Sequence, residues 1–249
     1  MRYSVIIPYF RTPEITRLCL YSVFKFAQGD PEVIVVDNAP GSVESAMLRE
    51  FEKAIVLDNA TTKRGSDANF DALERGLARA THDLVALIHS DSIFLRHGWD
   101  VEWFSYLQKH DLAGLSTFDR ESNPFRPLRK RIADRLRHLR HVRRVRPDAR
   151  EKLMVYFLLT RRSVLARAEF SFIRDRDITV AHLARAGRPI EVLSALETSR
   201  FLWHTSNVTS LLTGQMNDPK LAAIYREKRT RLLAEPSIRE AFGPVLPRE

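Results

Sequence analysis

The hexapeptide EVIVVD, residues 32–37, places four consecutive β-branched side chains between two carboxylates. An unbroken run of this kind is typical of a strand in a parallel sheet, where both faces are covered and apolar residues need not alternate with polar ones. A shorter run, VII at residues 5–7, precedes it, and two more follow it, AIVL at 54–57 and LVALI at 84–88. These four runs predict strands of one parallel sheet.

Helical patterns separate the four runs, as the crossover connections of a parallel sheet require. Thr12 suits the N-cap of a helix, Pro13 its first position and Glu14 its first turn. We therefore expect a helix that continues to about Ala27. A second helix is expected from Ser66, because the apolar residues that follow it recur three and four positions apart. The N-terminal half of the chain thus predicts the α/β class.

Shorter elements are expected in the second half of the chain. An apolar run predicts a strand over 153–159, and two closing strands are expected over 190–193 and 200–203. A helix over 178–185 should end before a glycine, and residues 219–235 have helical composition.

All of the excess positive charge lies between residues 120 and 150. This segment holds eleven arginines and one lysine against three acidic residues, a net charge of +9, which equals the net charge of the whole chain. Between Pro127 and Pro147 its apolar residues recur at intervals of three and four, so an amphipathic helix is predicted there. We expect a neutral α/β body with a basic helical insertion.

An anionic partner is expected for this insertion, and several interpretations stay open. It could anchor the protein to an anionic membrane surface, clamp an anionic acceptor or diphosphate, or be a solvated or packed helix. Nucleic acid is disfavoured, because the aromatic side chains that stack on single strands are almost absent from the segment. The arginines proposed to contact the partner are Arg129, Arg131, Arg137, Arg140, Arg143 and Arg144.

Composition excludes several classes of protein. The single cysteine, Cys19, excludes an intramolecular disulfide, and no apolar run approaches the ~20 residues of a membrane span. The N-terminus is expected to be the first strand rather than a signal peptide. We therefore expect a cytoplasmic protein, peripheral at the inner face of the membrane if the basic segment binds lipid. Neither the glycine-rich dinucleotide fingerprint nor a P-loop is present in the sequence.

Polar residues follow three of the predicted strands. Asp37 ends the second strand, Asp58 and Asn59 follow the third, and the tripeptide HSD at 89–91 follows the fourth. Open parallel sheets bind ligands at the carboxyl ends of their strands, so these groups should feed one crevice. Any one of them could equally begin a turn or cap a helix. Asp91 together with a distant histidine suits a divalent cation that bridges diphosphate oxygens.

Four segments carry a more specific pattern: SVIIPYF at 4–10, LYSV at 20–23, VIVVDN at 33–38 and LIHSDS at 87–92. Together they resemble the opening of the GT-A glycosyltransferases of family 2. The resemblance covers about residues 3–100 and recurs more weakly over 153–204. It implies a GT-A, Rossmann-like fold with a mostly parallel central sheet flanked by helices.

The resemblance also implies a domain organisation and a reaction. The GT-A domain would span residues 1–204, interrupted by the basic helical insertion at 120–150, and a C-terminal helical tail would span 205–249. The enzyme would be an inverting glycosyltransferase that moves a sugar from a nucleotide-diphosphate sugar to a hydroxyl of a glycan or lipid-linked acceptor. A non-catalytic GT-A-like protein, which uses its arginine-rich helix to bind an anionic membrane or nucleic acid, is the rival hypothesis.

Site residues follow from the same resemblance. Asp91 matches the second Asp of the family's Asp-x-Asp motif and, with His204, would hold Mn²⁺ or Mg²⁺; His89 replaces the first Asp. A histidine after a strand, such as His204, could instead be structural. The residues implied to bind the nucleotide are Pro8, Tyr9, Asp37, Asp67, Asn69 and His89.

The catalytic base is expected near residue 175. RDRD at 174–177 lies where the family has its acidic catalytic motif, and an inverting transferase needs a carboxylate that takes the proton of the acceptor hydroxyl. Asp175 and Asp177 are both candidates. Either could instead cap the helix that is predicted to begin near Ile178.

Overall fold

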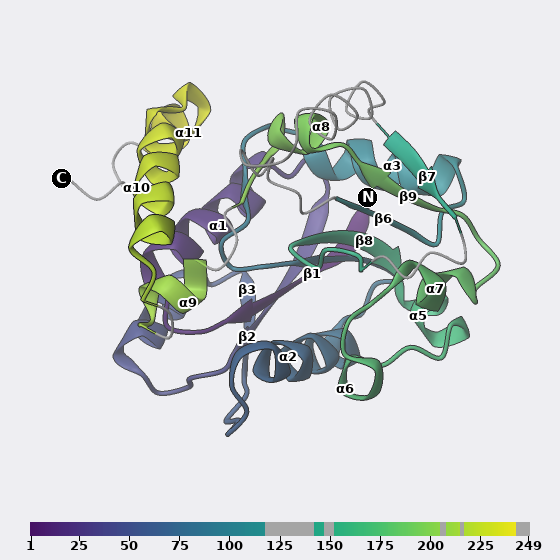
Figure 1. Cartoon of the computed structure of the whole chain (residues 1–249), viewed down its shortest axis with the longest axis horizontal. Helices are drawn as coiled ribbons and strands as arrows, with labels where there is room; N and C mark the ends of the chain where they lie inside the picture. The colour runs from purple at the N-terminus through teal and green to yellow at the C-terminus, as the bar shows by residue number, and fades with distance from the viewer. Residues whose placement is uncertain (118–141, 147–151, 205–207, 215–216, 243–249) are drawn as a thin grey trace.

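The structure is a computed structural model of the chain. It describes residues 1–117, 142–146, 152–204, 208–214 and 217–242. Eight of the described strands form a central sheet in the order β3-β2-β1-β4-β8-β6-β9-β7 (Figure 1). They are β1 (Arg2–Tyr9), β2 (Asp30–Asp37), β3 (Ala54–Asp58), β4 (Leu84–Ile88), β6 (Gly114–Thr117), β7 (Val142–Val145), β8 (Phe157–Arg161) and β9 (Ile190–Leu193). Only β7 and β8 run antiparallel to their neighbours, which confirms an α/β fold with a mostly parallel sheet.

Helices connect and cover these strands, and a small second sheet pairs β5 (Ile93–Phe94) with β10 (Leu202–Trp203). A 3₁₀ helix, η1, spans Val43–Glu50. The α-helices that the structure describes are α1 (Pro13–Phe26), α2 (Gly65–Arg79), α3 (Trp99–Lys109), α5 (Arg162–Arg167), α6 (Phe172–Asp175), α7 (Val180–Ala184), α8 (Ala195–Ser199), α9 (Val208–Leu212), α10 (Pro219–Ala234) and α11 (Pro236–Phe242).

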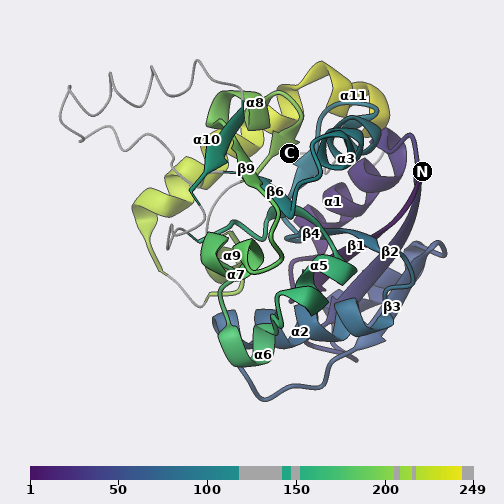
Figure 2. The ribbon, with the colours of Figure 1, turned by 90° about the vertical axis from the view of Figure 1, so that its right-hand side faces the viewer.

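Both faces of the parallel strands are buried, as the hexapeptide at 32–37 predicts. Val33 and Val35 belong to a core that they share with residues of α1 and α3. Ile34 and Val36 point the other way, into a core that they share with residues of α2. Figure 2 shows α1 and α3 on one side of the sheet and α2 and α6 on the other. The β-branched run is therefore explained by burial of alternate residues on opposite faces.

The parallel strands end level with one another. Tyr9 at the end of β1 is in register with Asp37 at the end of β2, and Asp37 with Asp58 at the end of β3. Because α2 follows β3, its N-terminus lies at the same edge of the sheet. α2 packs so closely on β1 that a Cβ atom on Gly76 would lie 2.3 Å from Cγ2 of Ile6. The lack of a side chain at Gly76 therefore allows α2 to pack this closely against the sheet.

The basic segment departs from the prediction where the structure describes it. Most of the expected helix lies in 118–141 and 147–151, outside the described residues. Val142–Val145, predicted as its last turn, instead forms β7 at one end of the sheet, antiparallel to β9. The helical prediction is wrong here because tertiary pairing overrides the local pattern. Both valines pack against the cores, and Arg144 lies 3.5 Å from the buried carboxylate of Glu191.

Other elements of the second half agree with the sequence apart from their ends. β9 has the predicted bounds, while α7 and β10 lie inside the ranges predicted for them. The strand expected over 153–159 is displaced: β8 spans Phe157–Arg161, and among the described residues 152–156 the one β-bridge joins Lys152 to Thr179.

The described helices after residue 204 include one, α10, that contacts the α/β body. α10 confirms the helix predicted over 219–235. The guanidinium of Arg229 donates to Oε1 of Glu14, at the start of α1, from 2.6 Å and 2.9 Å. Among the described helices, none has the length and apolar character that a membrane span needs.

Candidate active site

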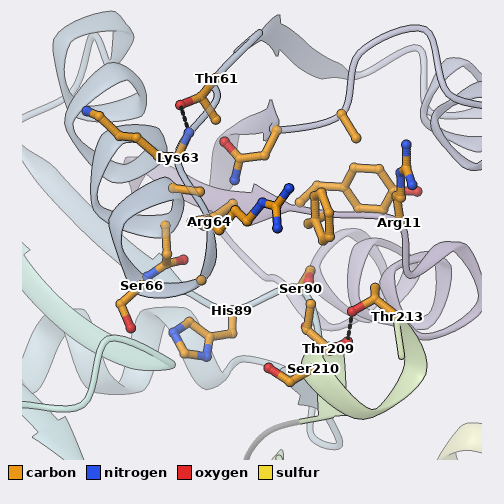
Figure 3. A pocket seen from close by; sticks show the side chains of 18 of the residues that line it. Arg11, Thr61, Lys63, Arg64, Ser66, His89, Ser90, Thr209, Ser210 and Thr213 are labelled. Carbon is orange, nitrogen blue, oxygen red and sulfur yellow. Dashed lines mark hydrogen bonds between the residues drawn. The ribbon is translucent and has the colours of Figure 1, made fainter. Parts of the chain in front are cut away.

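A cavity of about 1190 Å³ lies at the carboxyl edge of the parallel strands (Figure 3). The ends of β1, β2 and β4 form part of its wall, together with the loop that connects β3 to α2. The first turns of α2 and, from the C-terminal part of the chain, α9 with Thr213 just after it contribute the rest. Of the three polar groups noted at strand ends in the sequence, only His89, Ser90 and Asp91 line this cavity; Asp37, Asp58 and Asn59 do not.

The predicted nucleotide-binding residues divide into two groups. The residues that line the cavity are Pro8, Tyr9, Asn69 and His89. Asp37 and Asp67 do not line it. The carboxylate of Asp37 is buried and accepts the backbone N–H of Ala39 at 2.8 Å, which is the role of a turn residue. Asp67 forms an ion pair with Arg176 at 2.7 Å. A nucleotide contact of either residue stays a prediction.

His89, Asp91 and His204 form a compact cluster. One potential ligand atom from each lies within 4.8 Å of the others. Oδ1 of Asp91 is 3.4 Å from Nε2 of His204 and 3.9 Å from Nδ1 of His89. Asp91 is 3% exposed, and its Oδ1 accepts no hydrogen bond of normal geometry from the described residues.

Long-range pairing builds this cluster. β10 pairs with β5 so that Trp203 is opposite Ile93, which brings His204 beside the chain that leaves β4. The ring of Tyr156 then stacks on the imidazole of His204, with 3.9 Å between centroids and 5° between planes. His204 is thus held in place by the small sheet and by an aromatic neighbour.

The electrostatics of Asp91 suit a cation. Burial alone would raise the pKa of its carboxyl group, but the imidazoles of His204 and His89 outweigh burial and hold the pKa below its ordinary value. A buried carboxylate oxygen without a hydrogen-bond donor is unfavourable unless another positive group completes its environment. One carboxylate and two imidazoles form a donor set that fits a divalent cation.

Part of the cavity wall is formed by residues that were not predicted from the sequence. Residues not anticipated there include Arg11, Lys63, Arg64, Thr209, Ser210 and Thr213. A signal existed for the first three, since basic residues just after a strand or before a helix lie at the ligand-binding edge of a parallel sheet. The hydroxyl-bearing side chains of α9 had no such signal, because only tertiary packing brings α9 to the cavity.

The two candidate bases lie on the turn at 175–177, where the chain leaves α6, and neither lines the cavity. Arg176, between them, has a φ of 61°, a backbone conformation that residues other than glycine rarely adopt. Arg176 also reaches Asp67 in the first turn of α2, next to residues that form the cavity wall. The turn at 175–177 is therefore joined to the cavity rim by an ion pair.

Different contacts distinguish the two carboxylates. Asp175 accepts hydrogen bonds from the backbone N–H of Ser171 at 3.0 Å and from Nε and Nη2 of Arg174 at 3.1 Å and 2.8 Å. The Arg174 guanidinium and this N–H hold the pKa of Asp175 below its ordinary value. Asp177 contacts Lys152, and its side chain is 45% exposed. Asp177 is the more accessible of the two.

Comparison with known families agrees with this geometry. The sequence model of glycosyl transferase family 2 matches residues 4–167, more than half of the chain. The chain belongs to glycosyl transferase family 2. No curated protein matches it by sequence.

Solved structures show the same fold at low identity. S. aureus TarS matches with a TM-score of 0.61 and 16% identity, over 100% of this chain and 50% of TarS. Residues 1–349 of TarS in complex with UDP match with a TM-score of 0.58 and 15% identity, over 99% of this chain and 76% of that one. The mannosyltransferase PcManGT from Pyrobaculum calidifontis, in complex with GDP-Man and Mn²⁺, matches with a TM-score of 0.58 and 15% identity, over 78% of this chain and 56% of PcManGT. The chain thus spans about half the length of TarS and of PcManGT.

The basic segment is described only in part. Arg143 and Arg144 lie on β7, and the side chain of Arg144 is 65% exposed despite its contact with Glu191. The other four proposed arginines lie outside the described residues. An anionic membrane or other anionic partner for this segment stays a prediction.

Proposed function

We propose that this chain is a metal-assisted inverting glycosyltransferase that moves a sugar from a nucleotide-diphosphate sugar to a hydroxyl of a glycan or lipid-linked acceptor. One observation carries the proposal: His89 and the buried Asp91 line the cavity at the carboxyl edge of the sheet, and His204 completes a cluster with them that could hold a metal ion. Membership of glycosyl transferase family 2 supports it. Fold neighbours are described in complex with UDP, UDP-GlcNAc, or GDP-Man and Mn²⁺, which supports a nucleotide-sugar donor.

Three groups of residues would have distinct roles in this reaction. Asp91 and the two histidines would hold a divalent cation, which offsets negative charge on the departing diphosphate when it is bound. Pro8, Tyr9, Asn69 and His89 would form the wall against which the nucleotide lies. The turn at 175–177 would supply the carboxylate that removes the proton of the acceptor hydroxyl as its oxygen attacks the anomeric carbon.

Calorimetric titration of UDP, GDP and dTDP, each with and without Mn²⁺, tests the donor site. We expect one nucleotide to bind, and we expect Mn²⁺ to strengthen that binding, because a cation held by Asp91 would offset the negative charge of the diphosphate. Adenosine diphosphate under the same conditions controls for nonspecific attraction of phosphate. Failure of every nucleotide to bind would contradict the proposal and favour a non-catalytic role for the fold.

The composition of the cluster makes a further prediction about the ion. Mg²⁺ prefers oxygen ligands in octahedral geometry, whereas imidazole suits later transition metals and Mn²⁺ accepts mixed sites. We therefore expect Mn²⁺ to bind at least about tenfold more tightly than Mg²⁺. His89→Asp should narrow this difference by adding an oxygen ligand. Metal competition, followed by the electron paramagnetic resonance of free Mn²⁺, measures it.

His97→Asp is the matched control, because His97 is exposed and does not line the cavity. This variant should leave the metal preference unchanged. Equal affinities for Mn²⁺ and Mg²⁺ in the unaltered protein would show that the two imidazoles are not both ligands.

A further inference from the structure

One wall of the cavity is positively charged. Arg11, Lys63 and Arg64 line it and are exposed. Two of these cations already have neighbours: Lys63 pairs with Asp71 at 2.8 Å, and the guanidinium of Arg11 lies 5.7 Å from the ring centre of Phe10. Within the described residues, Arg64 has neither an ion pair nor a side-chain hydrogen bond. Figure 3 shows its guanidinium extending into the middle of the cavity.

The backbone presents Arg64 to the cavity. Arg64 is the N-cap residue of α2, with extended φ and ψ of −130° and 158°, and no side chain caps this helix end. Gly65 follows with a φ of 56°, a conformation that favours glycine. Gly65 and Ser66 also line the cavity. The positive end of a 15-residue helix therefore faces the same space as the arginine.

The opposite part of the cavity contains little negative charge. Asp91 is the only carboxylate among the lining residues that the structure describes. A divalent cation held by one carboxylate and two neutral imidazoles would keep a net positive charge. Together with Arg64 it would attract a group with several negative charges rather than a neutral base or sugar.

We propose that Arg64 binds the diphosphate of the donor. The N-terminus of α2 would thereby add a positive charge to that of the cation held by His89, Asp91 and His204. This inference rests on the proposed function and adds a residue to it. A guanidinium forms two parallel hydrogen bonds to phosphate oxygens, which the single ammonium of lysine does not reproduce. Arg64 therefore contributes both charge and geometry.

The test compares ligands that differ only in phosphate. UDP, GDP and dTDP are titrated into the protein, each beside its monophosphate and its nucleoside, with Mn²⁺ and with EDTA. Arg64→Gln should weaken binding of the diphosphate by about 10- to 100-fold and leave nucleoside binding unchanged. Arg64→Lys should recover only part of the loss. The dependence of diphosphate affinity on salt should become weaker in Arg64→Gln.

Arg49→Gln is the matched control, since Arg49 is an exposed arginine at the end of η1 that does not line the cavity. Thermal melting checks that Arg64→Gln is folded. Unchanged diphosphate affinity in Arg64→Gln overturns the inference, and an equal loss for the nucleoside also overturns it by assigning Arg64 to the base. Absence of nucleotide binding in the unaltered protein instead overturns the proposed function.

Discussion

Asp91→Asn is expected to lower turnover by about 10³-fold or more and to remove the effect of Mn²⁺ on nucleotide binding. Asp91 is the only carboxylate of the cluster, and an amide of the same shape carries no charge to hold a cation. The fold should survive, because the substitution preserves side-chain volume and removes a buried charge. Turnover with the nucleotide sugar and direct Mn²⁺ titration measure the two effects.

Asp58→Asn is the control for this experiment. Asp58 ends β3 in register with Asp37, so it is a carboxylate at the same edge of the sheet, but it does not line the cavity. Its replacement should leave turnover and metal binding close to those of the unaltered protein. Normal turnover in Asp91→Asn would show that the chemistry does not depend on this cluster.

The sequence predicted those parts of the fold that depend on burial of a continuous segment. A run of β-branched residues such as 32–37 is buried whichever strand lies beside it, so its neighbours need not be known. The start of α1 also depends on the local sequence, and Pro13 and Glu14 occupy its first turn as expected. Thr12 does precede this helix, but its hydroxyl contacts that of Thr16 instead of capping the backbone.

Features that depend on distant partners could not be predicted in the same way. Val142–Val145 has a helical pattern, yet it is a strand because β9 offers a free edge and both cores accept its valines. The place of His204 depends on the pairing of β10 with β5. The family resemblance suggested His204 as a ligand, whereas spacing along the chain gave no such information.

The conformation of the turn at 175–177 could not be predicted from the local sequence either. Sequence suggested that Asp175 or Asp177 could cap the next helix, but Thr179 is its cap, and its hydroxyl accepts the N–H of His182 at 3.3 Å. The positive φ of Arg176 separates the two carboxylates and gives them different partners. No local sequence pattern predicts a positive φ at an arginine.

Asp177→Asn is expected to lower kcat by about 10²- to 10⁴-fold, the range for loss of a general base, while nucleotide affinity stays unchanged. The accessible carboxylate of Asp177 is the better base, because Asp175 is held by Ser171 and Arg174 and its lowered pKa weakens it as a proton acceptor. Stability should change little in Asp177→Asn, since its described partner is the exposed Lys152. Single-turnover kinetics and thermal melting separate the two effects.

Asp175→Asn is the informative comparison, because it changes the same chemical group two residues away. It weakens the bond from the Ser171 N–H at the start of α6, so we expect it to lower the free energy of unfolding by about 1 kcal/mol. Its kcat should stay within a few-fold of that of the unaltered protein when both are folded. The reverse pattern, in which Asp175→Asn is stable but inactive and Asp177→Asn is active, would assign the base to Asp175. The contacts with Ser171 and Arg174 would then have to break when the acceptor binds, and the turn would have to rearrange around Arg176.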